Sequence, residues 1–238
     1  MVELELDDGL AVITINRPEA RNAIAPETMD QLETALDEAK GAQALVITGG
    51  GDKAFVSGGD LKQLSALRTI EEAEAMARRM RGICDQIAAF PAPVIAALNG
   101  HALGGGAEVA VAADIRIAAD DIKIGFNQVT LAIMPAWGGA ERLAALVGKS
   151  RALLLAGGGA LLGAEEAERL GLVDRVLPRA SFDEGWKVVA RSLANNSSGD
   201  IKRVIGGATP DEAVAAFARL WVADEHWAAA DRVMNRKR

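Results

Sequence analysis

Two glycine-rich loops could carry chemistry in this chain. The first, residues 55–62, reads FVSGGDLK, and the second, residues 99–108, reads NGHALGGGAE. Glycine allows a backbone to approach a ligand closely and leaves N–H groups free to point outward. If both loops face one point, these N–H groups could stabilise negative charge on a bound oxygen, and the second loop would add the positive end of a helix. Tight turns without a catalytic role are the alternative.

One carboxylate, Glu108, directly follows the second glycine run. A glutamate near a helix start is also favoured by the helix dipole, which would account for an exposed acid. Beside a ligand pocket, the same carboxylate could take a proton as a general base. We therefore treat Glu108 as a candidate catalytic residue.

Other catalytic and binding motifs do not fit this sequence. Val109 occupies the last glycine position of a dinucleotide-binding G-x-G-x-x-G motif, and no phosphate-binding G-x-x-x-x-G-K-[ST] motif occurs. Ser57 lacks the G-x-S-x-G frame of a nucleophile elbow. The two histidines, His101 and His226, lack the spacing of metal ligands. We expect both histidines to be structural and expect no metal site.

Length and composition fit one large domain. The chain has 238 residues, half of them apolar, and a formal net charge of -7, which disfavours binding to nucleic acid or to an anionic membrane. Its single cysteine, Cys84, excludes an internal disulfide. No stretch reaches the roughly 18 apolar residues of a membrane span, and residues 1–10 do not resemble a signal peptide. We expect a cytoplasmic protein.

Hydrophobic patterns predict strands and helices that alternate over most of the chain. Residues 2–6 and 10–15 predict a hairpin with its turn at Asp8-Gly9. A helix is predicted from Pro26 to Lys40, and Thr69 is expected to cap another that extends to about Phe90. Further strands are predicted over residues 44–48, 94–98, 115–118, 122–126 and 173–176, and further helices over residues 104–113, 138–147 and 150–155 and in a segment ending at Gly171.

The last part of the sequence has a different pattern. From about Ser181 the chain is predicted to be helical, with one clear loop at residues 195–199. Alternating strands and helices followed by helices alone predict an α/β core with a helical C-terminal extension.

Several motifs, in the same order, resemble those of the enoyl-CoA hydratase/isomerase (crotonase-like) family. The similarity covers roughly residues 10 to 180. It is carried by residues 15–18 (INRP), 21–23 (RNA), 55–61 (FVSGGDL), 93–108 (PVIAALNGHALGGGAE), 113–118 (ADIRIA), 135–143 (PAWGGAERL) and 164–173 (AEEAERLGLV). The resemblance implies a spiral of ββα units over residues 1–180 and a helical C-terminal region, residues 181–238, that takes part in trimerisation. A homotrimer or hexamer is therefore expected.

The resemblance also implies roles for individual residues. The backbone N–H groups of Gly59 and Gly105 would hold the thioester oxygen of an acyl-CoA while that oxygen carries the charge of an enolate. Glu108 occupies one of the two glutamate positions with which the family's hydratases activate water. No separate cofactor is implied, because coenzyme A is part of the substrate. The residues expected to contact the substrate or its CoA part are Arg21, Gly58, Asp60, Lys62, Gly104, Pro135, Ala136 and Trp137.

The second glutamate position of the family is occupied here by Gln128. Gly125 and Pro135 set the register on either side. An amide is not a base near neutral pH, although it can orient a water or a substrate carbonyl. Ala136 also replaces the glycine usual after the proline, although its N–H remains available. The sequence therefore predicts slow hydration compared with hydratases that have two glutamates.

Hydratase and isomerase chemistry share the enolate, and two alternatives to them stay open. Residues 133–139 (IMPAWGG) also resemble ethylmalonyl-CoA decarboxylase-like members, which keep the first glutamate and lack the second. Decarboxylation of a short 2-carboxyacyl-CoA forms the same enolate without a base. The other alternative is a non-catalytic acyl-CoA-binding protein, against which the retention of Glu108 with both loops argues.

Overall fold

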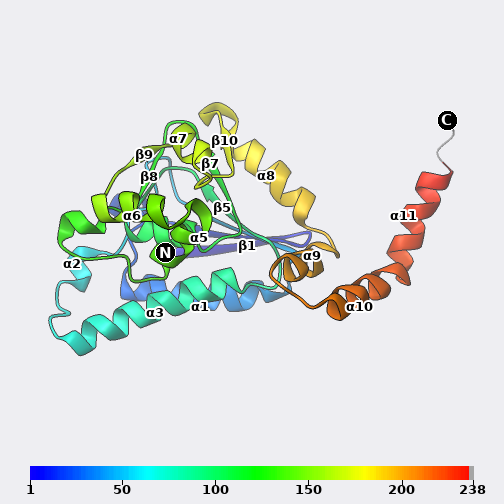
Figure 1. Ribbon diagram of the computed structural model, residues 1–238, viewed down its shortest axis with the longest axis horizontal. Helices are drawn as coiled ribbons and strands as arrows, with labels where there is room; N and C mark the ends of the chain where they lie inside the picture. The colour runs from blue at the N-terminus through cyan, green and yellow to red at the C-terminus, as the bar shows by residue number, and fades with distance from the viewer. Residues whose placement is uncertain (236–238) are drawn as a thin grey trace.

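Two β-sheets lie at the centre of the computed structural model, which describes residues 1–235. The larger sheet has the strand order β1-β2-β3-β5-β7-β10 and the smaller one β4-β6-β8-β9 (Figure 1). The strands of the larger sheet are β1 (Val2–Asp7), β2 (Leu10–Ile15), β3 (Ala44–Gly49), β5 (Val94–Leu98), β7 (Ile115–Ala119) and β10 (Arg175–Leu177). The smaller sheet consists of β4 (Ala54–Val56), β6 (His101–Leu103), β8 (Lys123–Gly125) and β9 (Leu162–Gly163).

The predicted hairpin forms the edge of the larger sheet. Strands β1 and β2 pair antiparallel, and the turn residues Asp8 and Gly9 have φ values of 45° and 79°. Positive φ at both central positions matches the right-handed twist of a hairpin. The other pairings of this sheet are parallel. Every residue of β3 and β5 is buried, as expected for parallel strands covered on both faces.

The chain repeats a strand–strand–helix unit, and each unit contributes one strand to each sheet. The three units are β3-β4-α3, β5-β6-α4 and β7-β8-α5, with short helical turns in between. Each second strand, in the smaller sheet, pairs parallel with the corresponding strand of a neighbouring unit. The expected α/β spiral of ββα units is therefore present.

Helices surround the sheets and form the whole C-terminal part. Their bounds are α1 (Pro26–Glu38), α2 (Leu61–Leu64), α3 (Ile70–Ala88), α4 (Gly105–Ala110), α5 (Gly139–Val147), α6 (Lys149–Gly158), α7 (Ala164–Arg169), α8 (Phe182–Leu193), α9 (Ser198–Ile205), α10 (Pro210–Trp221) and α11 (Asp224–Met234). Single 3-10 turns are η1 (Pro18–Ala20), η2 (Ala39–Gly41), η3 (Asn127–Leu131) and η4 (Arg179–Ser181). Within residues 1–235, none of the helices has the length and apolar character needed to cross a bilayer.

Helix α3 begins as predicted. Thr69 and Glu72 form a capping box, in which the Thr69 hydroxyl accepts the Glu72 N–H at 3.1 Å. Its buried face includes Met80, Ile83 and Ile87, which pack into the core, and the helix lies against α1 along one side of the body (Figure 1). The local signals of cap and periodicity were therefore sufficient to place this long helix.

Several predicted elements differ from the structure, and residues 54–56 and 162–163, for which no strand was predicted, form β4 and β9. Residues 101–103 were treated as loop but form β6, because a three-residue strand is too short to show a period. The strand predicted over residues 173–176 is β10, at Arg175–Leu177; Val173 is instead buried in the turn after α7, where its N–H donates to Ala167. The helix predicted over residues 104–113 ends at Ala110.

The C-terminal helices divide into a packed part and a projecting part. Helix α8 packs against β3 and β7 and buries Phe182 and Trp186, whereas α10 and α11 extend away from the body (Figure 1). The tail contains a second break besides the predicted loop at 195–199: α9 ends at Ile205, and Gly207 has a φ of 105° before α10 starts. Residues 236–238 of the predicted helical region lie outside the described residues.

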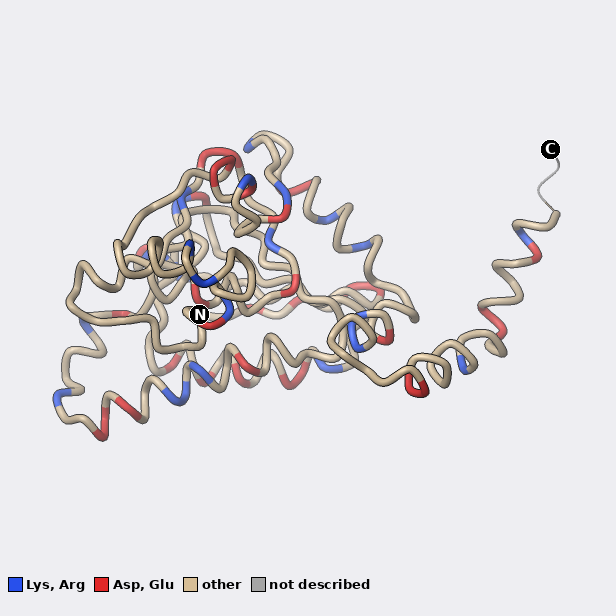
Figure 2. The backbone as a smooth tube through the Cα atoms, viewed as in Figure 1, with Lys and Arg blue, Asp and Glu red and all other residues tan. Residues whose placement is uncertain are grey.

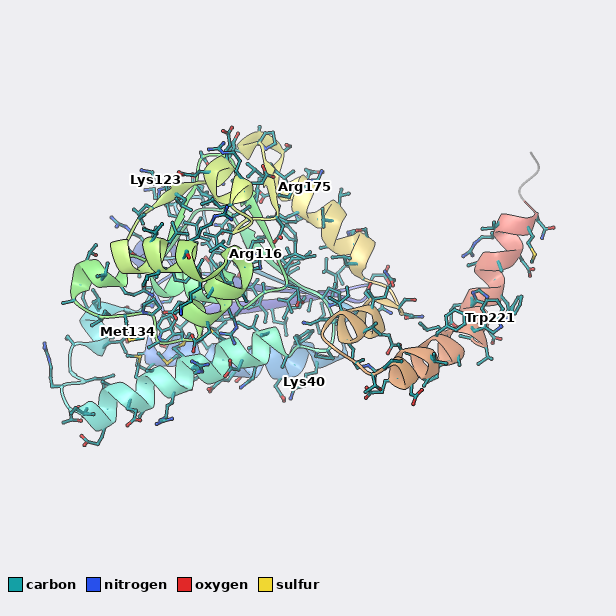
Figure 3. The ribbon with its side chains drawn as sticks, viewed as in Figure 1. Lys40, Arg116, Lys123, Met134, Arg175 and Trp221 are labelled. Atoms are coloured by element: carbon teal, nitrogen blue, oxygen red, sulfur yellow. The ribbon has the colours of Figure 1, made fainter. Side chains whose placement is uncertain are left out.

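A buried arginine connects the spiral to the segment before β10. Arg116 in β7 is 2% exposed, and Figure 3 labels it inside the body. Its guanidinium donates to the carbonyl oxygens of Leu172 and Ala113, at 2.9 Å each, and to the Asp174 carboxylate at 2.5 Å. All of its partners are fixed by the fold, so the charge has a structural role.

Candidate active site

A cavity of about 680 Å³ opens between the two glycine-rich loops and the helices α2 and α3. One wall is polar and is formed by the loops and the residues that follow them. The rest of the lining is mostly apolar. The polar wall contains Arg21, Ser57, Gly58, Gly59, Gly104, Gly105, Glu108, Asn127 and Gln128. The apolar wall and rim contain Leu61, Leu64, Leu67, Ala73, Met76, Ala77, Leu131, Ile133, Met134, Ala136 and Trp137, together with Arg68.

The two glycine loops approach each other closely. Gly58 has a φ of 99° and Gly104 a φ of 56°, conformations that a residue with a side chain rarely adopts. A Cβ atom placed on Gly58 would lie 3.3 Å from the Gly105 nitrogen, and one on Gly105 would lie 2.2 Å from the Trp137 ring. Only glycine fits at this junction.

Two backbone N–H groups are available at the junction. Gly105 is the first residue of α4, so its N–H has no partner within the helix. Within residues 1–235, neither the Gly59 N–H nor the Gly105 N–H donates to a protein acceptor. Both residues line the cavity. A bound carbonyl oxygen could therefore accept hydrogen bonds from both.

Glu108 is buried beside these donors and is held by three hydrogen bonds. It lies in the first turn of α4 and is 2% exposed. One carboxylate oxygen, Oε2, accepts the N–H groups of Trp137 at 2.7 Å and Gly139 at 3.0 Å, at the start of α5. The other oxygen, Oε1, accepts the side-chain amide of Gln128 at 2.9 Å. The carboxylate thus joins α4, α5 and the 3-10 turn η3.

The surroundings of Glu108 make it a stronger base than an exposed glutamate. Burial raises the pKa of the carboxyl group above its ordinary value, and the hydrogen bonds from Gly139, Trp137 and Gln128 partly oppose this. A carboxylate with a raised pKa accepts a proton more readily. The residue is therefore suited to take a proton from a molecule in the cavity.

Gln128 lies next to Glu108, as the register of the sequence implied. It is in η3, is 7% exposed and lines the cavity. Its amide nitrogen donates to Glu108, and its amide oxygen is buried without a hydrogen-bond partner. The pair consists of one titratable group and one neutral group.

Five of the eight expected substrate contacts line the cavity, namely Arg21, Gly58, Gly104, Ala136 and Trp137. The other three are not among its lining residues. Asp60 instead forms an ion pair with Arg17 at 3.0 Å and caps α2 by accepting the Gln63 N–H. Lys62 is exposed on α2, and Pro135 is buried.

Most of the apolar wall was missed by the sequence analysis, which expected only Ala136 and Trp137 of its members to contact the substrate. Its members on α2 and α3 include Leu64 and Met76, and Figure 3 shows Met134 at the same end of the body as α2. Met76 is partly buried on the same helix as the core residues Met80, Ile83 and Ile87. Which part of that helix covers a cavity depends on the turn between α2 and α3, for which the sequence shows no signal.

A second, polar cavity of about 500 Å³ adjoins the first and shares Arg21, Ser57 and Leu103 with it. Its cationic residues are Arg21, Lys53 and Arg179, and its acids are Asp52 and Asp121. Arg179 is paired with Asp121. Charged residues of both signs are distributed along the chain (Figure 2).

No candidate metal centre was found within residues 1–235, where no three or more His, Cys, Asp or Glu side chains group to hold an ion. His101 is exposed, and its Nδ1 accepts the N–H of Lys123 at 3.0 Å. Cys84 is buried, and burial raises the pKa of its thiol to about 12. The thiol is therefore protonated near neutral pH and is a poor nucleophile.

Comparison with known proteins identifies the family. The sequence profile described as enoyl-CoA hydratase/isomerase matches residues 5–206. The chain belongs to the enoyl-CoA hydratase/isomerase family. It is an acyl-CoA enzyme of this family, and the family resemblance found in the sequence is confirmed.

Similar sequences and structures agree with this assignment. The crotonyl-CoA hydratase of Syntrophomonas wolfei is 40% identical over 195 residues, which cover 80% of this chain and 75% of that protein. The short-chain-enoyl-CoA hydratase of Clostridium acetobutylicum is 36% identical over 209 residues, covering 84% and 78%. The crystal structure of enoyl-CoA hydratase from Thermoplasma volcanium is 33% identical with a TM-score of 0.86, covering 99% and 97%. That from Bacillus anthracis is 29% identical with a TM-score of 0.84, covering 94% and 91%.

Proposed function

We propose that this member of the family adds water across the double bond of a short-chain 2-enoyl-CoA and that Glu108 is the only carboxylate that moves a proton. The observation that carries the proposal is the buried Glu108 carboxylate beside the two available N–H groups of Gly59 and Gly105. The names of the similar crotonyl-CoA and short-chain-enoyl-CoA hydratases support the substrate class.

The glycine N–H groups would stabilise the charge that develops in the reaction. When an oxygen nucleophile adds to C3 of an enoyl thioester, electrons move to the thioester oxygen, which becomes an enolate oxygen. Two donors fixed by the backbone need no rearrangement to meet this charge, and each is worth about 3 kcal/mol by analogy with other oxyanion holes. Gly59 and Gly105 supply them from separate loops, so the oxygen would be held between the loops.

Glu108 would transfer one proton of the added water, while the other proton stays in the new hydroxyl group. Its carboxylate takes one proton from the water as the hydroxyl adds to C3, and the same proton is then delivered to C2 of the enolate. The balance is one hydroxyl at C3 and one proton at C2, with the carboxylate restored. Gln128 cannot take part in proton transfer, because an amide is neither a useful base nor a useful acid near neutral pH.

The two cavities fit the two parts of an acyl-CoA. The apolar wall suits a short hydrocarbon chain, since burying each methylene group stabilises the complex by about 0.8 kcal/mol. The adjoining polar cavity, with Arg21 and Lys53, suits the phosphates of coenzyme A. Lys62, on the exposed face of α2, stays a prediction for the same phosphates. No cofactor besides the coenzyme A of the substrate is required by this scheme.

Assembly and location complete the proposal. The projecting helices carry exposed apolar side chains, including Phe217, Trp221 and Trp227, and Figure 3 shows Trp221 in the tail away from the body. Such surfaces are typical of subunit interfaces, so we propose a homotrimer or hexamer in which residues 181–238 contribute to the contacts. We also propose that the enzyme acts in the cytoplasm and binds neither nucleic acid nor membranes.

The test is incubation with a panel of CoA thioesters followed by mass spectrometry. Crotonyl-CoA is expected to gain the mass of one water, and a 3-enoyl-CoA is included to detect isomerisation. The Glu108→Gln variant, with its fold checked by circular dichroism, serves as the control. Carbon dioxide loss from ethylmalonyl-CoA without hydration of crotonyl-CoA would contradict the proposal.

A further inference from the structure

A turn at residues 137–139 connects Glu108 to a second charged side chain, Arg142. The two outer peptide groups of the turn donate their N–H groups, on Trp137 and Gly139, to Glu108 Oε2 at 2.7 and 3.0 Å. The middle peptide group presents its carbonyl oxygen, on Trp137, to the guanidinium of Arg142, which donates to it at 3.2 Å. The same turn is therefore hydrogen-bonded to both side chains.

Both side chains also pack closely against the turn. A Cβ atom on Gly139 would lie 2.3 Å from Glu108 Cγ, and one on Gly138 would lie 2.2 Å from Arg142 Nη1. Gly138 has a φ of 88°, which glycine adopts without strain. A displacement of the Arg142 guanidinium would therefore open space beside the backbone that donates to Glu108.

Arg142 supports the turn with its backbone as well as its side chain. Gly138 is the N-cap residue of α5, and glycine has no side chain with which to cap a helix. The Arg142 N–H donates to the Gly138 carbonyl oxygen at 3.3 Å, and the guanidinium reaches the preceding carbonyl oxygen, on Trp137. A cation near the start of a helix opposes the helix dipole, so helix stability does not account for an arginine here.

Arg142 is anchored to α3 and lies outside the cavity lining. A terminal nitrogen of its guanidinium pairs with the Asp85 carboxylate on α3, and the side chain is 20% exposed. Asp85 directly follows Cys84, which packs into the core, so the anchor belongs to a fixed part of the fold. The arginine therefore joins α3 to the turn without being one of the residues that line the cavity.

We infer that Arg142 is a positioning residue whose guanidinium holds the turn at residues 137–139 so that the N–H groups of Trp137 and Gly139 stay directed at Glu108. The inference rests on the proposed function, in which Glu108 transfers the proton, and adds a residue that acts on Glu108 through the backbone.

The loss of this support would change both the basicity and the orientation of Glu108. Burial raises the pKa of its carboxyl group, and the hydrogen bonds from Gly139 and Trp137 oppose this rise. If the turn moves away, these bonds weaken and the pKa rises further. The carboxylate would also be less well oriented, so the reaction would slow even at a pH where Glu108 is ionised.

Other ionisable groups surround Glu108 and define the control. On β4 and β6, which also pack against α4, the one titratable residue is His101, at the exposed start of β6. The remaining groups are Arg81, Cys84 and Asp85 on α3, Glu141 on α5, and Arg21 and Arg68 in the cavity lining. Arg81 hydrogen-bonds Glu141 at 2.7 Å rather than the turn. Arg81→Met therefore removes a nearby positive charge and leaves the support of the turn in place.

The experiment measures the pH dependence of kcat and the KM for crotonyl-CoA hydration with the complete protein. In Arg142→Met, we expect the acid-side midpoint to move to higher pH and the plateau kcat to fall about tenfold, less than the 10²-fold that a misplacement of 1 Å can cost. The KM should change less than kcat, because Arg142 does not line the cavity. Arg81→Met should keep the wild-type plateau.

Asp85→Ala provides a second test through the anchor of Arg142, and circular dichroism verifies the fold of each variant. The loss of a negative charge alone would move the midpoint to lower pH, because a nearby anion disfavours ionisation of Glu108. Release of the turn moves it the other way. We therefore expect a higher midpoint and a kcat reduced by less than in Arg142→Met.

The outcomes separate the inference from the proposed function. A folded Arg142→Met variant with the wild-type plateau and midpoint would overturn the inference alone. Equal changes in Arg142→Met and Arg81→Met would also overturn it, because charge and not the turn would then be responsible. In Asp85→Ala, a lower midpoint with unchanged kcat would do the same. A wild type that does not hydrate crotonyl-CoA would overturn the proposed function and the inference with it.

Discussion

The two walls of the large cavity are built in different ways. The loop wall consists of glycine backbone and of a buried carboxylate, Glu108, which is held by three donors at 2.7, 2.9 and 3.0 Å. The helical wall consists of apolar side chains from α2, α3 and the segment before α5, several of them exposed. The loop wall therefore tolerates few substitutions at each position, whereas the helical wall tolerates many. Under the proposed function, reaction chemistry would depend on the loop wall and acyl-chain preference on the helical wall.

Removing the carboxylate from the loop wall should have the largest effect. Glu108→Gln keeps the size of the side chain but removes the base, so the rate of crotonyl-CoA hydration is expected to fall about 10²–10⁴-fold. Binding of butyryl-CoA should be retained, because the glycine donors are unchanged. Kinetics and calorimetry on the folded variant check both points. A variant with wild-type kcat would show that the base lies elsewhere.

A single methyl group at the loop junction should have the next largest effect. The Cβ atom of Gly105→Ala would lie 2.2 Å from the Trp137 ring, so the ring or the loop must move. Displacing one oxyanion donor typically lowers kcat about 10²–10³-fold, and overpacking lowers the free energy of unfolding by about 1–3 kcal/mol. Gly82→Ala on α3 is the control, since nothing lies within 4 Å of its added Cβ. Unchanged activity in Gly105→Ala would remove this N–H from the mechanism.

Restoring a second carboxylate to the loop wall should raise the rate of hydration. Gln128→Glu is nearly isosteric and provides a group that can share proton transfer. Because Glu108 already supplies one base, hydration of crotonyl-CoA is expected to rise about tenfold or more, which is less than the full 10²–10⁴-fold range for general acid–base catalysis. Stopped-flow or steady-state hydration assays measure the change. A wild type that already hydrates rapidly and gains nothing from the substitution would show that the amide is no handicap.

Changes in the helical wall should have the smallest effect on rate. Met76→Ala enlarges the apolar wall, so the ratio of kcat/KM for hexenoyl-CoA to that for crotonyl-CoA is expected to rise about 10-fold, as for a pocket that gains room for methylene groups. The kcat for crotonyl-CoA should change little. Ile70→Ala, also on α3 but 80% exposed and outside the cavity lining, is the matched control. Equal shifts in both variants would argue against Met76 as part of the acyl site.

The contrast between the loop wall and the helical wall also explains which features could be predicted from the sequence. Asp8-Gly9 and the Thr69 cap carry their signals within a few residues, so the hairpin and α3 were found. The loop wall follows from two short motifs, residues 55–62 and 99–108, and Gly59, Gly105 and Glu108 from these motifs line one cavity.

Elements that depend on distant partners were not predictable in the same way. Strand β6 has three residues and exists because β4 and β8 flank it. The apolar wall depends on how α2 turns into α3. Asp60, Lys62 and Pro135 are neighbours of lining residues in the sequence, but the direction of each side chain is set by its packing.

The central claim is that one carboxylate serves the whole reaction, and the dependence of kcat/KM on pH for crotonyl-CoA hydration tests it most directly. Because burial raises the pKa of Glu108 and the base form is active, the wild-type rate should rise with pH through a single ionisation with a midpoint above the ordinary value of 4.5.

In the Gln128→Glu variant, the two neighbouring carboxylates should titrate as a coupled pair, because like charges disfavour joint ionisation. The profile should then show two ionisations on the acid side. A wild-type profile that already shows two carboxylate ionisations, or one that does not change in Gln128→Glu, would contradict the account.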